Sequence, residues 1–421
     1  MAGRTTRSLR TWKGRAVAAS IAGTAALALA ACGGGGGFDD GGGGGATEGS
    51  DNGPLTVLIG SSGDAETQTM TSLLQAFTDE TGIQANLRNA TNLPQELAQG
   101  FAAGSPPDLF YVSPEQFPGW ASNGSLYAYG DQLDATFHDT LKQTFTFDGK
   151  FFCAPKDFST LALVVNTTAW TAAGLTDADY PKTWDDLKAV AQKLTTGTQV
   201  GLSFGPEWAR IGAFMAQAGG HMLDADGHAD VDTPENLAAL TYVKDLLTSG
   251  VAAKPSQVDS GWGGEAFGSQ RAAMTIEGNW IVGAMRADFP TVQYKVVPLP
   301  EGPGGKGTLQ FTNCYGIAAD SDHKEAAVRL ANFLTSDEQQ MEAARGFGVM
   351  PAVDTVADQW AEENPDQKAF VDGAEYAQGV APIEGWTDVI TDFNAQLEGL
   401  TTADPQAILT SVQSSLAAIA P

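Results

Sequence analysis

Short apolar segments rich in β-branched residues alternate with amphipathic helical segments along most of this chain. The first series begins at Leu55, and in it apolar residues spaced for one helical face separate three predicted strands, at 55–59, 83–87 and 109–112. Strands that alternate with helices in this way predict a parallel sheet with helices on both faces. The ligands of such sheets lie beyond the carboxyl ends of the strands.

The same alternation starts again in the middle of the chain. A second set of strands is predicted at 161–165, 200–204, 273–276 and 295–297. Thr183 and Thr233 have the character of helix N-caps, and further helices are predicted over 323–345, with a break near 335–337, and from Pro405 onward. Two α/β units in a chain of 421 residues predict a cleft between them, which is a common place for a ligand.

The N-terminal segment precedes both series and indicates the cellular compartment. A basic stretch over 4–15 leads into an apolar run over 16–31 that is shorter than the roughly 20 residues of a membrane span. Leu29-Ala30-Ala31-Cys32 resembles a bacterial lipobox, although an ordinary cleavage site with an incidental cysteine is the alternative. Glycine fills ten of the thirteen positions 33–45, which is typical of a flexible tether. We therefore expect a signal peptide over 1–31, a tether over 32–53, and a lipid on Cys32 that holds the protein on the outer face of the cytoplasmic membrane.

Charge and cysteine content exclude several classes of function. The chain has 50 acidic and 23 basic residues, a formal charge of −27, and removal of 1–31 takes away five basic residues and no acidic one. A surface this acidic repels phosphate backbones, so binding of nucleic acid is excluded. With three cysteines and four histidines, a cysteine-rich zinc protein is excluded as well. We expect no metal, no cofactor and a monomeric protein.

Several segments resemble the extracellular solute-binding proteins of carbohydrate ABC transporters, the family that includes maltose-binding protein. They occur in the family's order, at 79–83, 107–110, 180–187, 272–280 and 333–338. The resemblance implies a two-lobed α/β fold of the type II periplasmic-binding-protein kind, with one lobe over 54–162 plus 314–365 and the other over 163–313 plus 366–421. It also implies a carbohydrate ligand, delivery to an ABC permease, and no enzymatic activity.

The resemblance also points to ligand-binding residues on both lobes. A sugar site needs aromatic faces for stacking and short polar side chains that donate and accept hydrogen bonds. The candidates are Asp64, Ser113, Glu115, Asp157, Ser159, Glu207, Trp208, Trp280, Asn313, Tyr315 and Trp386. For the tryptophans core packing is the alternative, and for Asp64 it is a helix N-cap.

The same resemblance places two of the three cysteines, Cys153 and Cys314, in neighbouring hinge strands. Two unpaired thiols are unusual in an oxidising compartment, so we expect a disulfide between them.

Other functions remain open from the residues alone. A receptor for another small solute, such as a polyol or a glycerol phosphate, is the nearest alternative. Residues 201–205 fit the G-x-S-x-G pattern of a serine hydrolase, with Ser203 as nucleophile, but Ser203 is predicted inside a strand and not on the sharp turn that such a nucleophile needs. The acidic stretch from Asp224 partly resembles a calcium loop, but a hairpin turning at Asp226-Gly227 is the better interpretation.

Overall fold

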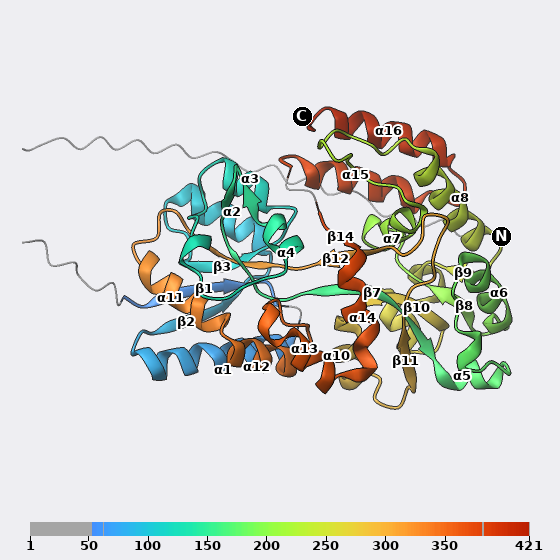
Figure 1. Cartoon of the computed structure of the whole chain (residues 1–421), viewed down its shortest axis with the longest axis horizontal. Helices are drawn as coiled ribbons and strands as arrows, with labels where there is room; N and C mark the ends of the chain where they lie inside the picture. The colour runs from blue at the N-terminus through green and yellow to red at the C-terminus, as the bar shows by residue number, and fades with distance from the viewer. Residues whose placement is uncertain (1–52, 62, 381–382, 421) are drawn as a thin grey trace, which may run out of the picture. The chain divides into compact units, whose positions relative to one another are not determined.

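The structure, a computed structural model, describes residues 53–61, 63–380 and 383–420, all within the compact unit Ser50–Pro421 (Figure 1). The predicted signal peptide, Cys32 and nearly all of the predicted tether lie outside the described residues. The described chain forms two main sheets and a small hairpin, β4 (Thr146–Phe147) with β5 (Lys150–Phe151).

The first sheet has five strands in the order β2-β1-β3-β13-β6. Their bounds are β1 (Leu55–Ile59), β2 (Ala85–Asn89), β3 (Leu109–Val112), β6 (Ala154–Pro155) and β13 (Cys314–Ile317). β1 pairs in parallel with β2 and β3, whereas β13 runs antiparallel between β3 and β6. The three early strands are parallel, as predicted, and a late strand, β13, is added to them in the antiparallel direction.

The second sheet has seven strands, in the order β14-β12-β7-β10-β8-β9 with β11 also paired to β7. Their bounds are β7 (Ser159–Asn166), β8 (Val200–Ser203), β9 (Ala252–Ala253), β10 (Ala272–Gly278), β11 (Tyr294–Val297), β12 (Thr308–Phe311) and β14 (Ala377–Gln378). The chain therefore passes from the first sheet to the second between β6 and β7, returns between β12 and β13, and passes to the second sheet again between β13 and β14. β7 is part of the second sheet from its first residue, so the predicted lobe boundary at 162/163 falls inside this strand.

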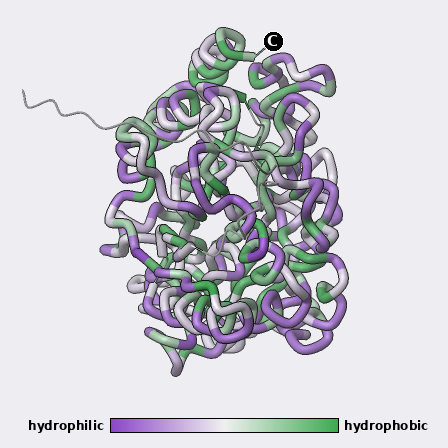
Figure 2. Tube along the Cα trace, turned by 90° about the vertical axis from the view of Figure 1, so that its left-hand side faces the viewer, coloured by the Kyte–Doolittle hydropathy of each residue, from purple (hydrophilic) through white to green (hydrophobic). Residues whose placement is uncertain are grey.

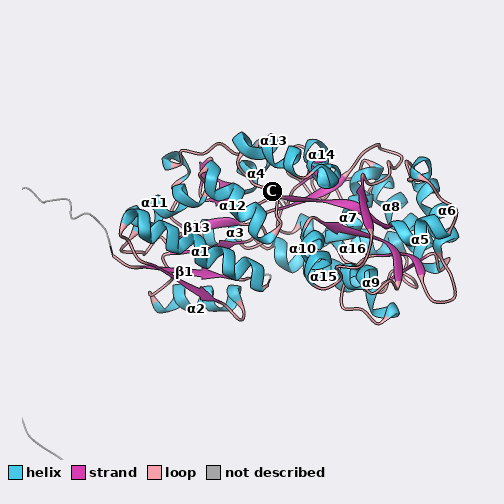
Figure 3. Cartoon of the chain, turned by 90° about the horizontal axis from the view of Figure 1, so that it is seen from below, coloured by secondary structure: helices cyan, strands magenta, loops and turns pink. Residues whose placement is uncertain are grey.

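Helices lie on both sides of the strands (Figure 3). Before β7 and after β13 they are α1 (Asp64–Thr81), α2 (Leu93–Ala103), α3 (Phe117–Ser122), α4 (Asp139–Thr144), α11 (Lys324–Leu334), α12 (Asp337–Phe347) and α13 (Asp354–Glu363). The others are α5 (Thr167–Ala172), α6 (Trp184–Leu194), α7 (Trp208–Ala218), α8 (Pro234–Thr248), α9 (Gly263–Gly268), α10 (Trp280–Ala287), α14 (Lys368–Gly373), α15 (Trp386–Glu398) and α16 (Pro405–Ala417). Short 3₁₀ turns cover Gly130–Gln132, Asp177–Asp179, Pro255–Val258, Pro365–Gln367 and Ala374–Tyr376.

Local sequence signals account for several helix ends. Thr183 caps α6 through a capping box with Asp186, as predicted, and the Thr233 side chain accepts a hydrogen bond at the start of α8. α1 ends at Gly82, which has the left-handed φ of 74° that favours glycine. The predicted break near 335–337 separates α11 from α12.

Two hydrophobic clusters form the core. One includes β1, β3 and the apolar face of α1, and the other includes β8 and α8. The outer turns of the chain are largely hydrophilic (Figure 2). Among the described residues no helix has the length and apolar character needed to cross a bilayer.

Candidate ligand-binding site

A pocket of about 470 Å³ is lined by residues next to both sheets and by two of the segments that cross between them. The first helix and the loop after β3 contribute from one side, and the starts of α7 and α10 from the other. Residues 156–159 and 310–313, which flank the crossings, lie between these two sides. A concave site with polar groups and aromatic rings at a junction of this kind is a natural place for a small ligand.

The structure brings six of the eleven predicted site residues together in the lining of this pocket. They are Glu115, Asp157, Ser159, Trp208, Trp280 and Asn313. They come from several separate segments between Glu115 and Asn313, so the fold itself assembles the set.

The other five predicted residues lie outside this lining. Asp64 is exposed as the first residue of α1, after the N-cap Gly63, and so does not itself occupy the N-cap position. The backbone carbonyl of Ser113 accepts hydrogen bonds at the start of α3, and Glu207 is the N-cap residue of α7.

Tyr315 and Trp386 are both buried in the core. The Tyr315 ring packs 5.9 Å from that of Tyr111, measured between ring centroids, and Trp386 lies within the second hydrophobic cluster. Trp386 contacts the edge of Trp208, with ring centroids 5.7 Å apart, and both line an adjacent pocket of about 360 Å³. Roles in ligand binding for these five residues stay predictions.

Trp280, at the head of α10, is held by a buried ion pair beneath it. Its indole Nε1 donates to Glu277 Oε2 at 3.0 Å, and Arg210 Nη2 donates to the same oxygen at 2.6 Å. The Arg210 guanidinium also lies 5.3 Å from the centre of the Trp280 ring, and Phe311 meets that ring edge-on at 5.2 Å. Burial raises the pKa of Glu277, and Arg210 opposes that rise. The indole orientation is therefore fixed from several sides while part of its surface faces the pocket.

A second buried charge cluster lines the pocket next to the first sheet, where Glu66 belongs to α1 and Lys156 and Asp157 follow β6. Lys156 Nζ donates to Glu66 Oε1 at 3.0 Å and forms an ion pair with Asp157. The same ammonium lies 4.5 Å from the centre of the Tyr111 ring. Burial alone would lower the pKa of Lys156, but Asp157 and Glu66 outweigh it and the pKa is raised. Lys156 is thus a permanent cation whose partners are already in place.

The crossing segments are joined by the predicted disulfide. Cys153 and Cys314 form it, with Cα atoms 5.7 Å apart. Just beyond the bond, Lys156 N donates to Asn313 O at 2.8 Å, and Thr312 Oγ1 donates to Asp157 O at 2.7 Å. The pocket residues of the two crossings are therefore linked to one another by covalent and hydrogen bonds.

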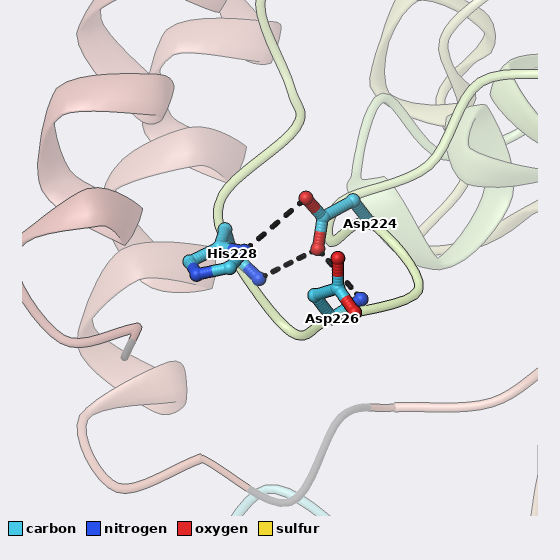
Figure 4. Close-up of side chains that lie close together, drawn as sticks. All are labelled: Asp224, Asp226 and His228. Carbon is cyan, nitrogen blue, oxygen red and sulfur yellow. Dashed lines mark hydrogen bonds and ion pairs between the residues drawn. The ribbon is translucent and has the colours of Figure 1, made fainter.

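The acidic stretch after α7 forms a hairpin, as predicted (Figure 4). Asp224 Oδ1 accepts hydrogen bonds from the backbone N–H groups of Asp226 and His228, and Asp224 Oδ2 lies 3.3 Å from His228 Nδ1. All three side chains are exposed, and each of these contacts stabilises the turn itself.

Comparison with known proteins matches residues 61–341 to the model of the bacterial extracellular solute-binding proteins. The diacetylchitobiose-binding protein DasA of Streptomyces coelicolor is 25% identical over 347 residues, which is 76% of this chain and 80% of that protein.

Solved structures of two such proteins resemble the fold. The Listeria monocytogenes ABC substrate-binding protein Lmo0181, in complex with cycloalternan, has a TM-score of 0.77 at 22% identity, over 87% of this chain and 98% of that one. The GacH receptor of Streptomyces glaucescens has a TM-score of 0.78 at 21% identity, over 86% and 97%. Since the family model covers well over half of the sequence, the chain belongs to the bacterial extracellular solute-binding proteins.

Proposed function

We propose that the protein binds a sugar or oligosaccharide in the 470 Å³ pocket and delivers it to an ABC transporter permease. The observation that carries the proposal is the fixed indole of Trp280, which is part of a lining that also holds Trp208, carboxylates and amides. Aromatic faces stack on the apolar C–H surfaces of a sugar, and short polar side chains satisfy its hydroxyls. Relatives named for diacetylchitobiose and galactooligosaccharide binding, and a neighbour solved with cycloalternan, support the ligand class.

A phosphorylated solute fits the pocket poorly. Such a ligand needs an unpaired cation, and Lys156 already contacts two carboxylates. Arg210 is likewise bound to Glu277 and lies 3.5 Å from Glu207. A glycerol phosphate is therefore disfavoured, while a neutral polyol remains compatible with the lining.

The hydrolase alternative is not supported by the position of Ser203. It is the last residue of β8 and its side chain is fully buried, so the hydroxyl does not reach a substrate. The solute-binding family, moreover, consists of binding proteins and not of enzymes.

A panel of mono- and oligosaccharides tests the proposal on the purified protein. We expect at least one of them to change the tryptophan fluorescence and raise the melting temperature. Trp280→Ala should weaken this ligand by about tenfold or more, since it removes the stacking surface. The matched control is Trp262→Ala, which truncates a half-buried tryptophan outside the pocket lining. If no sugar produces either signal, the carbohydrate assignment is wrong.

We further propose that a lipid on Cys32 tethers the protein to the outer face of the cytoplasmic membrane. The lipobox-like sequence and the glycine-rich segment after it support this placement. Cys32→Ser should move the protein from the membrane fraction to the medium. A variant that stays with the membrane would show that another feature anchors it.

A further inference from the structure

The charged floor of the pocket contains more negative than positive charge. Glu66, Lys156 and Asp157 have side chains that are 4%, 3% and 13% exposed, so two carboxylates share one ammonium in a nearly dry place. A surplus of buried charge of one sign is costly, and it draws in either a proton or a cation. Burial raises the pKa of Asp157, Lys156 opposes that rise, and the nearby Glu66 adds to it.

Two side-chain oxygens of residues in the pocket wall lack a hydrogen-bond donor among the described residues. Asn279 Oδ1 and Gln310 Oε1 are buried and, within the described part of the chain, receive no hydrogen bond. The amide nitrogens of the same two residues are already used, Asn279 Nδ2 to Gly348 O at 2.9 Å and Gln310 Nε2 to Thr144 Oγ1 at 3.4 Å. Buried polar atoms in native proteins normally have partners, so these two oxygens add unbalanced negative partial charge beside the pocket.

Glu115 adds a third carboxylate to the lining. It is half-buried, and no described residue donates a hydrogen bond to its side chain or forms an ion pair with it. The indole N–H of Trp280, which is a donor in the same lining, is already bound to Glu277 at 3.0 Å. The pocket therefore offers a ligand the carboxylate of Glu115 and an excess of negative charge.

We propose that the pocket selects a saccharide that carries a protonated amine, an amino sugar, over the neutral sugar of the same skeleton. A hydroxyl brings one donor and also needs donors for its own lone pairs, whereas an ammonium brings three donors, no acceptor and a positive charge. The ammonium matches the negative excess of this pocket, and a neutral hydroxyl does not. The inference rests on the proposed sugar-binding function and narrows its ligand class.

A bound metal ion does not offer the same match. Among the described residues, the group of acidic and histidine side chains close enough to share an ion is Asp224, Asp226 and His228 on the exposed hairpin. Glu66, Glu115 and Asp157 do not converge in this way. These three carboxylates are better suited to a larger ligand that fills the pocket and carries one positively charged group than to a single metal ion.

Matched sugar triplets test the selection by isothermal titration calorimetry. Each triplet has one skeleton with a hydroxyl, an amino or an acetamido group at C2: glucose, galactose, mannose, and the β-1,4-linked disaccharide cellobiose. We expect the amino member to bind about tenfold tighter than both of its counterparts in at least one triplet, since hydrogen bonds to charged groups are the stronger ones.

Measurements at two pH values then separate the effect of the ligand's charge from the effect of its shape. An amine with a pKa near about 8 is protonated at about pH 6 and neutral at about pH 9.5, so the preference should disappear at the higher pH. Lys156, Tyr111 and Tyr315 keep their protons over this range, because their pKa values are all raised. The pKa of Asp157 is also raised, so this carboxyl can only become more fully charged as the pH rises, and its titration would strengthen the preference and not abolish it. No histidine is among the described lining residues.

Two variants remove the negative excess itself. Asp157→Asn leaves Glu66 and Lys156 as a balanced pair, and Glu115→Gln removes the unpaired carboxylate without touching the buried cluster. In each, the ratio of amino to neutral affinity should fall toward one. Asp245→Asn, on the surface beside Lys188, is the matched control and should leave the ratio as it is.

The outcomes distinguish this inference from the broader function. If neutral or acetamido members bind as tightly as the amino member in every triplet that binds, the amine selection is overturned and sugar binding stands. The same holds if the preference survives at about pH 9.5 or in both pocket variants. If no member of any triplet binds, the selection is overturned, and the broader sugar panel alone then decides the proposed function.

Discussion

Replacement of Arg210 by methionine tests the buried ion pair beneath Trp280. The Glu277 side chain is 1% exposed and that of Arg210 is 13% exposed, with Nη2 and Oε2 2.6 Å apart. Methionine fills much of the same space but supplies no charge and no donor. Of the described side chains that now bond Glu277, the Trp280 indole would remain.

The expected loss is large because one charge of a buried pair is left behind. Removal of one partner from such a pair costs about 3–5 kcal/mol. At about 2 °C of melting temperature per kcal/mol for a large domain, the variant should melt roughly 6–10 °C lower. Ligand affinity should fall as well, since the Trp280 indole loses the guanidinium that lies 5.3 Å from its ring centre.

The loss should also depend on pH. Burial raises the pKa of Glu277 in the folded state, so the folded protein holds this proton more strongly than the unfolded chain does. The contribution of this carboxyl to the stability of the fold is therefore complete at low pH. It decreases as the pH rises from the pKa of Glu277 in the unfolded chain toward its pKa in the folded protein. Without Arg210 the folded pKa rises further, so the variant should be less destabilised at about pH 5 than at about pH 7.

Thermal unfolding followed by circular dichroism measures both effects, with Arg345→Met as the control. Arg345 also binds a glutamate through two nitrogens, at 2.8 and 3.1 Å to Glu363, but these side chains are 49% and 37% exposed. Surface pairs of this kind contribute little. The reasoning from burial is wrong if Arg210→Met has the same melting temperature as this control. It is also wrong if the loss of stability in Arg210→Met is no smaller at about pH 5 than at about pH 7.

Three further variants probe the framework around the pocket. Loss of the 161-residue cross-link in Cys153→Ala/Cys314→Ala should cost about 2–4 kcal/mol, and an unchanged melting temperature on reduction of the native protein would contradict this. Gly201→Ala places a methyl group 1.9 Å from a backbone oxygen of α6 and should destabilise by about 1–3 kcal/mol, whereas Gly197→Ala meets nothing within 4 Å and should not. Ser203→Ala removes a buried hydroxyl that lacks a partner among the described residues, so ligand affinity should be unchanged; a loss of binding or of any esterase activity would revive the hydrolase alternative.

The second strand shows where apolar patterning alone goes wrong. Ile83 is buried and suggested a strand over 83–87, but β2 begins at Ala85 and runs to Asn89. β2 is an edge strand of the first sheet, and its residues are mostly exposed or half-buried. An edge strand of this kind has little hydrophobic pattern in its own sequence. Its bounds are therefore set by its pairing with β1 and not by a local sequence feature.

The site was predictable where residues follow regular elements and less so in loops and in the core. Asp157, Trp280 and Asn313 adjoin strands, and the ends of strands place them in the lining. Trp386 begins a helix as predicted, but the packing of its ring was decided by contacts far away in the sequence. Glu66 was not among the predicted site residues, although the sequence contains a signal for it. Glu66 lies four residues before Met70, on the apolar face of α1. A charged side chain at such a position is buried at a cost and indicates a site.

The acidic composition of the chain and the acidic pocket have different consequences for binding. The net charge of −27 acts over a distance and is screened within about 8 Å at physiological salt, so it changes the rate at which any cationic ligand arrives. The pocket excess is local, because Lys156 and Arg210 are both already neutralised by carboxylates at contact distance. A preference for amino sugars that arises in the pocket should therefore persist when salt is raised to about 1 M, where the screening length is about 3 Å. If the preference disappeared at this salt concentration, its cause would be the net charge of the protein surface and not the carboxylates of the pocket.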